Sequence, residues 1–138
     1  NIMALPNGAG GYQVGDGNLN EVQMGVQAAP PTATATATLT TAQITGGILL
    51  GSPGSSAAAY TLPTGTLLDA AVPSAKVNSS FDFTVVNVDG SSSGVITMTA
   101  GTGWTIVGLA TIAATAGTAG TFRARRTGEA TWTLYRLA

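Results

Sequence analysis

The sequence holds few residues that could carry out acid–base or nucleophilic chemistry. It has no Cys and no His, so zinc ligands of those types and the usual base of a serine nucleophile are missing. Only Asp82 lies well inside an expected strand, so the sequence does not indicate a carboxylate pair that could cleave a glycan. The acidic residues are Asp16, Glu21, Asp69, Asp82, Asp89 and Glu129. We expect a protein that is not an enzyme and that uses no cofactor, metal or small-molecule substrate.

Two short motifs resemble functional sites, but each lacks an essential part. The stretch Gly90–Gly94 matches the Gly-x-Ser-x-Gly pattern of a nucleophile elbow, yet a strand rather than a helix is expected to follow it. We interpret it as a turn. Asn78-Ser79-Ser80 is a glycosylation sequon, a triplet that arises often by chance.

A calcium loop is the remaining metal candidate. Asp16, Asn18 and Asn20 offer oxygen ligands at the first, third and fifth positions of such a loop. Glu21 stands where Gly is needed, and Gln27 stands where a bidentate Glu is needed. A plain polar turn is the favoured interpretation, and whether these side chains hold a cation stays open.

Arginines form the only charge cluster. Strand alternation places Arg123 and Arg125 on one face, and Arg126 on the opposite face with Phe122 and Ala124. A solvated strand face is one interpretation, and contact with carboxylates or carbonyls of a partner is the other. No Gly-rich loop leads into a helix, which argues against a phosphate site.

The composition points to association. Charged residues make up 8% of the chain and the net charge is −1, whereas ordinary soluble domains have roughly 25% charged residues. A net charge near zero promotes association. The 5 basic residues are too few for a nucleic-acid footprint. No apolar run approaches the roughly 20 residues that span a bilayer, so no membrane partner is expected.

The chain divides into an arm, residues 1–31, and a domain, residues 32–138. The arm is rich in Gly, shows no lasting period and ends at Pro30-Pro31. Apolar residues recur along it, which suggests that it lies on another surface. We expect partner contacts from the arm and from the arginine strand, through Ile2, Leu5, Tyr12, Val14, Leu19, Val22, Met24, Arg123 and Arg125. Docking on a partner and pairing within an oligomer are both open for the arm.

The first half of the domain mixes strand and helix signals. Residues 32–40 alternate Thr with Ala and Leu, which predicts a strand with a face of small residues. Residues 42–50 predict a bent strand around Gly46-Gly47, and residues 57–62 another strand. A threonine cap followed by Leu67, Leu68 and Ala71 predicts the one short helix, over 66–72, which Pro73 ends.

The last 58 residues repeat short alternating runs separated by Gly turns, including an expected hairpin turn over 89–94. Strands spaced about 8–12 residues apart are typical of a sandwich or barrel. We predict an all-β fold, a β-sandwich or jelly-roll-like domain with one short helix and an extended N-terminal arm.

Several of these stretches resemble segments of tailed-phage capsid decoration, or cement, proteins and of some phage fibre proteins. The similarity runs from about Ala57 onward and covers about 80 of the 138 residues, and the blocks that carry it are 59–70, 80–87, 100–108, 120–125 and 131–136. The resemblance implies a homotrimer of β-domains that stands on the outer surface of a phage capsid.

From the resemblance we expect a virion structural protein that binds the major capsid protein and stabilises the head. The alternative is a tail-fibre or head-fibre module that recognises a glycan on the host surface. Glycan sites set aromatic platforms beside polar groups, but Trp104 and Trp132 alternate in step with apolar neighbours. That pattern predicts core residues and favours the decoration protein.

Overall fold

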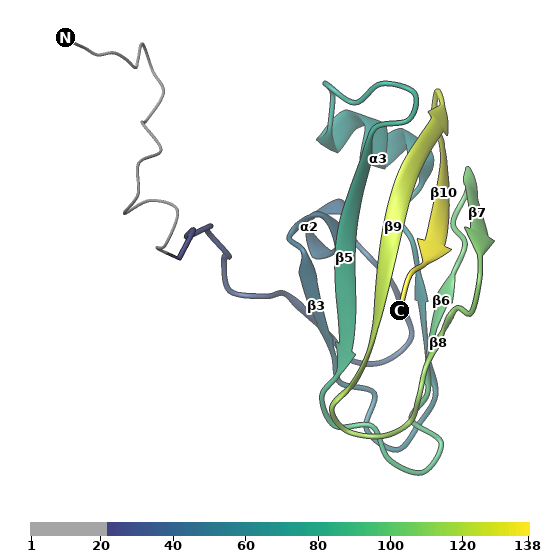
Figure 1. Cartoon of the computed structure of the whole chain (residues 1–138). Helices are drawn as coiled ribbons and strands as arrows, with labels where there is room; N and C mark the ends of the chain where they lie inside the picture. The colour runs from purple at the N-terminus through teal and green to yellow at the C-terminus, as the bar shows by residue number, and fades with distance from the viewer. Residues whose placement is uncertain (1–21) are drawn as a thin grey trace, which may run out of the picture.

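The computed structural model describes residues 22–138, which form two sheets and two short helices, so the expected all-β fold is confirmed (Figure 1). The larger sheet has six strands in the order β1-β3-β5-β9-β10-β7. Their bounds are Thr32–Ala33 (β1), Ile48–Gly51 (β3), Ser80–Asn87 (β5), Thr118–Gly128 (β9), Thr131–Arg136 (β10) and Trp104–Val107 (β7).

The smaller sheet has four strands in the order β2-β4-β6-β8. Their bounds are Ala37–Thr38 (β2), Ala58–Thr61 (β4), Ile96–Thr99 (β6) and Thr111–Ile112 (β8). From β1 to β8 the chain passes to the other sheet after every strand. As a result, five of the eight strand pairings that the described residues make are parallel. This departs from a jelly roll, whose strands are antiparallel.

One hydrophobic core lies between the two sheets, because each strand buries every second side chain. Tyr60 and Met98 enter it from the smaller sheet, and Phe83, Phe122 and Trp132 enter it from the larger sheet. Phe83 and Phe122 face each other across β5 and β9, with ring centroids 5.7 Å apart. The alternation of these residues in the sequence therefore predicted their burial correctly.

The expected continuous strand over residues 32–40 is wrong. The chain forms β1, bends, and then forms β2 in the other sheet. Ala33 is buried, but Ala35 and Ala37 are exposed, so no small-residue face exists. The carbonyl of Ala33 accepts from the N–H of Ser52, and the single hydroxyl proton of Tyr60 reaches the carbonyl oxygens of Ala33 at 2.9 Å and Thr34 at 2.8 Å, where the chain leaves the larger sheet.

The expected bent strand over 42–50 is wrong in its first half, which forms the helix α2, Thr41–Thr45. Thr40 and Gln43 make a capping box, Ile44 is buried, and Gly47 with a φ of 91° leads into β3. A second helix therefore exists besides the expected one. That one is confirmed as α3, Gly65–Ala71, with the Thr64 side chain accepting from the backbone N–H of Leu67.

The expected hairpin at 89–94 is also wrong, since β5 and β6 belong to different sheets. The segment does form a turn, as expected for Gly90–Gly94, and it carries the chain across the molecule. Asn87, fully buried, organises it: its amide nitrogen donates to the carbonyl groups of Gly94 and Ala113, and its oxygen accepts from the N–H of Gly90. In residues 22–138 no helix is long and apolar enough to cross a membrane.

Candidate functional site

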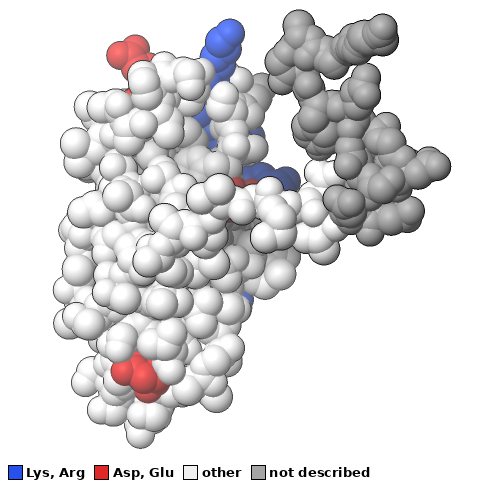
Figure 2. All heavy atoms as spheres, turned by 90° about the vertical axis from the view of Figure 1, so that its left-hand side faces the viewer, with Lys and Arg blue, Asp and Glu red and all other residues white. Residues whose placement is uncertain are grey.

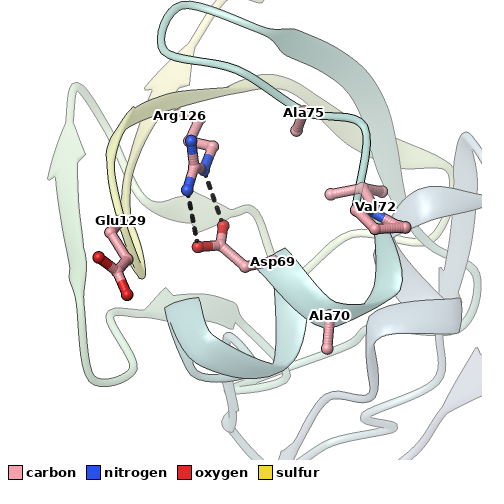
Figure 3. A pocket seen from close by; sticks show the side chains of 7 residues that line it. Asp69, Ala70, Val72, Ala75, Arg126 and Glu129 are labelled. Carbon is pink, nitrogen blue, oxygen red and sulfur yellow. Dashed lines mark hydrogen bonds and ion pairs between the residues drawn. The ribbon is translucent and has the colours of Figure 1, made fainter.

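The densest polar cluster of the described residues centres on Asp69, in α3. Its carboxylate accepts two hydrogen bonds from Arg126 in β9, from Nε at 2.9 Å and from Nη2 at 3.0 Å (Figure 3). It also accepts from the backbone N–H of Ala130 at 2.7 Å and from the indole Nε1 of Trp132 at 3.0 Å. One carboxylate thus ties the helix to both strands of the β9–β10 hairpin.

These donors stabilise the ionised carboxylate. The hydrogen bonds from Arg126 are the largest cause, with Ala130 and Trp132 adding to them against partial burial, and together they lower the pKa of Asp69 from 3.8 to about 2. A carboxylate with so low a pKa and four donors is a weak base. Its geometry suits holding the hairpin, and not general acid–base catalysis.

A surface hollow of about 460 Å³ opens beside this cluster, lined by Asp69, Ala70, Val72, Pro73, Ala75, Arg126 and Glu129 (Figure 3). A smaller and more apolar hollow of about 210 Å³ adjoins it, with Phe81 and Trp132 in its wall. In Figure 3 Glu129 stands apart from the Asp69–Arg126 pair, and Ala70 points away from it. The carboxylate of Asp69 and the guanidinium of Arg126 therefore point toward each other.

A second polar group lies on the outer face of the larger sheet. Arg123 donates to Asp82 on the neighbouring β5 from Nε at 2.6 Å and from Nη2 at 2.9 Å, and this pair is about half exposed. The hydrogen bonds that the carboxylate of Asp82 accepts from Arg123 lower the pKa of that carboxylate. Arg125 donates to the hydroxyl of Tyr135 at 3.0 Å and to the side chain of Asn78 at 2.8 Å.

Strand alternation predicted the faces of the three arginines correctly. Arg123 and Arg125 lie together on the outer face of β9, and Arg126 lies on the opposite face with the buried Phe122 and Ala124. Each has a polar partner inside the domain. Contact of Arg123 and Arg125 with a further partner stays a prediction.

The structure covers two of the predicted arm contacts. Val22 and Met24 are exposed by 80% and 86%. Ile2, Leu5, Tyr12, Val14 and Leu19 lie outside the described residues, and so does the calcium-loop candidate formed by Asp16, Asn18 and Asn20. Among residues 22–138 no three His, Cys, Asp or Glu side chains come close enough to hold a metal ion.

Most of the surface in Figure 2 is uncharged, with charged side chains at a few separate points. In the part of the chain that the structure describes, Asp69 and Asp82 each have an arginine partner, and Asp89 accepts from Ser52 and from the N–H of Gly54. Charged side chains are few and two pairs of them are neutralised within the domain, so the surface opposes contact with another protein only weakly.

Sequence reasoning missed the Asp69 cluster and the partners of Arg125. Asp69 follows two leucines in a helix signal, and nothing local shows that Arg126, 57 residues later, lies opposite. Comparisons of the chain with protein-family models, curated proteins and solved structures gave no match.

Proposed function

We propose that this protein is a non-catalytic structural protein of a phage virion, which decorates the outer surface of the head and stabilises it as a homotrimer. One observation carries the binding role: the extended segment 22–27 leaves a compact β-domain with its apolar side chains exposed. The location on a phage head and the trimeric state are inferred from the resemblance of five stretches of the sequence to capsid decoration proteins.

The polar groups of the domain support a structural role. Asp69, Asp82 and Asp89 accept hydrogen bonds from the domain itself, and of the two carboxylates that line the hollow, Asp69 is paired with Arg126 and Glu129 stands apart from that pair. Such groups stabilise loops and strand ends. They are poorly placed to bind or activate a substrate.

The burial of the tryptophans favours decoration over glycan recognition. Trp104 and Trp132 stack on each other with ring centroids 6.0 Å apart, and both are buried. The indole Nε1 of Trp104 donates to the carbonyl of Pro63, and that of Trp132 donates to Asp69. Neither ring is available as a platform for a sugar.

The test is to add the purified protein to phage heads that lack it and to image the particles by electron microscopy. Decoration predicts three-fold density on the outside of the head and a higher temperature of head disruption. Density on a tail or fibre, together with a specific signal on a glycan array, would establish the fibre alternative instead. Failure to bind any part of the particle would contradict both.

The matched variant lacks residues 1–21 and keeps the described segment 22–138. If the first part of the arm docks on the shell, this variant folds and self-associates but no longer binds heads. A variant that binds heads as well as the full chain would place the docking surface on the domain, with the strand that carries Arg123 and Arg125 as the next candidate.

A further inference from the structure

The segment Val22–Gln27 has the sequence of a strand without a strand partner. Val22, Met24 and Val26 alternate with Gln23, Gly25 and Gln27, the period of a half-buried strand. The three apolar side chains are exposed by 80%, 86% and 102%. Residues 22–27 make no backbone–backbone hydrogen bond to another described residue, and the side chain of Gln27 donates to the carbonyl of Gly46 at 2.9 Å, which fixes the end of the segment that lies nearest the domain. The segment therefore presents both an apolar face and a free backbone.

The larger sheet has an open edge at β7. Its strand pairs with β10 on one side, and no described residue pairs with its other side. The N–H of Trp132 donates to the carbonyl of Gly103, so residues 103, 105 and 107 direct their backbone groups toward β10. By alternation the N–H and carbonyl of Ile106 point outward, where another strand could accept and donate.

Exposed apolar side chains border this edge. Val107 is 49% exposed, and Leu109 and Leu137, which follow the ends of β7 and its partner β10, are 64% and 46% exposed. Val107 lies opposite Tyr135 on the outer face of the sheet. A strand added here would cover apolar surface as well as satisfy backbone groups, which is how strand addition gains both affinity and register.

A chain cannot place Val22–Gln27 on its own β7. The segment joins the domain at β1, and β1 and β7 are the two opposite edges of the larger sheet. Six strand spacings separate β1 from a strand added beyond β7, which is about 29 Å. The five steps from Gln27 to Thr32 span at most about 18 Å when fully extended. The acceptor must be another molecule.

We propose that Val22–Gln27 pairs with the β7 edge of a second copy of this chain, with Val22, Met24 and Val26 on the face that carries Val107. The inference goes beyond the proposed function, since it holds whether or not the assembly stands on a phage head. Each copy then donates its segment Val22–Gln27, which precedes β1, to one neighbour and accepts the same segment of another neighbour at its own β7. Such a head-to-tail contact closes into a ring or continues as a filament.

The first test compares two variants with equal added charge. Met24→Asp with Val26→Asp places two carboxylates on the face proposed to contact Val107, and Gln23→Asp with Gly25→Asp places two on the other face. A Cβ added at Gly25 meets nothing within 4 Å, so the control should leave the fold of the domain unchanged. We measure the protein concentration at which the oligomer dissociates, by size-exclusion chromatography with light scattering. For the first variant this concentration should be at least about a hundredfold higher than for the wild type, and for the control it should be close to that of the wild type.

The second test uses the absence of native cysteine. Met24→Cys chains mixed with Val107→Cys chains should form a cross-linked dimer under mild oxidation, and Met24→Cys mixed with Val77→Cys should not. Val77 is similarly exposed, at 57%, but it precedes β5, which is three strands away from β7 in the larger sheet. A wild type that is monomeric at micromolar concentration, an oligomer that both charge variants leave intact, or equal cross-linking to Val77→Cys would overturn the proposal. None of these readouts depends on phage particles.

Discussion

Asp69 and Arg126 lie 57 residues apart in the sequence and form a two-point ion pair that joins α3 to β9. The same carboxylate accepts from the backbone N–H of Ala130, a residue with a φ of 55° at the tip of the β9–β10 hairpin. A non-glycine residue at positive φ persists only where its surroundings hold it there. The Asp69 cluster is the group that holds this tip.

Replacing Asp69 with Asn should therefore destabilise the domain. The amide cannot accept all four hydrogen bonds, and the cost should be on the order of 2–3 kcal/mol in the free energy of unfolding, measured by urea denaturation. Asp82→Asn is the matched control, because the Asp82–Arg123 pair has a similar two-point geometry but is about half exposed. Equal losses in the two variants would show that Asp69 has no special role.

The same carboxylate predicts a loss of stability in acid. Its pKa is about 2 in the folded protein, below the usual 3.8, so its contribution is complete above about pH 4 and disappears as the pH falls through 2. Asp82, whose pKa is also lowered, adds to the loss in the same direction. The free energy of unfolding, measured by urea denaturation, should fall less between pH 6 and pH 2.5 in Asp69→Asn than in the wild type.

A third prediction concerns Gly65, the first residue of α3, which packs against Ala130 at the tip of the β9–β10 hairpin. A Cβ on Gly65 would collide with the carbonyl oxygen of Ala130. Gly65→Ala should cost about 2 kcal/mol through overpacking and lower the melting temperature by several degrees. Gly25→Ala, where an added Cβ meets nothing, should leave the melting temperature unchanged. An unchanged temperature for Gly65→Ala would mean that the hairpin tip moves freely.

The period-two pattern of the sequence was sufficient to predict an all-β fold and the burial of Phe83, Phe122 and Trp132, because burial on one face leaves a local signal. It was not sufficient for the topology. Glycine-rich connections look alike whether they turn back within one sheet or cross to the other, and here most of them cross. The strand signal of 32–40 failed for this reason, since it contains no mark of the point at which the chain leaves β1 for the second sheet.

The candidate site was harder still to predict. The face of each arginine followed from alternation along β9 alone, so Arg126 was correctly separated from Arg123 and Arg125. Its partner Asp69 depends on how α3 packs against the hairpin, and that contact leaves no trace in local spacing. Long-range pairs of this kind follow only from the three-dimensional arrangement of the elements.

The last prediction tests the crossing between the sheets at Asn87. This fully buried side chain donates to the carbonyl oxygens of Gly94 and Ala113, at 2.9 Å and 3.0 Å, and accepts from the N–H of Gly90 at 2.7 Å. Asn87→Ala removes all three bonds and leaves these backbone groups without this partner in a region that water reaches poorly, which should cost about 2–4 kcal/mol. Asn87→Asp should cost more, because a carboxylate cannot donate to the two carbonyls and would be buried. Ser91→Ala, on the exposed part of the same loop, is the control and should change the free energy of unfolding little. Hydrogen exchange should show the amide of Gly90 losing protection in Asn87→Ala while the amides of β9 keep theirs. A loop that stays protected in Asn87→Ala would mean that the turn itself, and not the buried amide, holds the crossing.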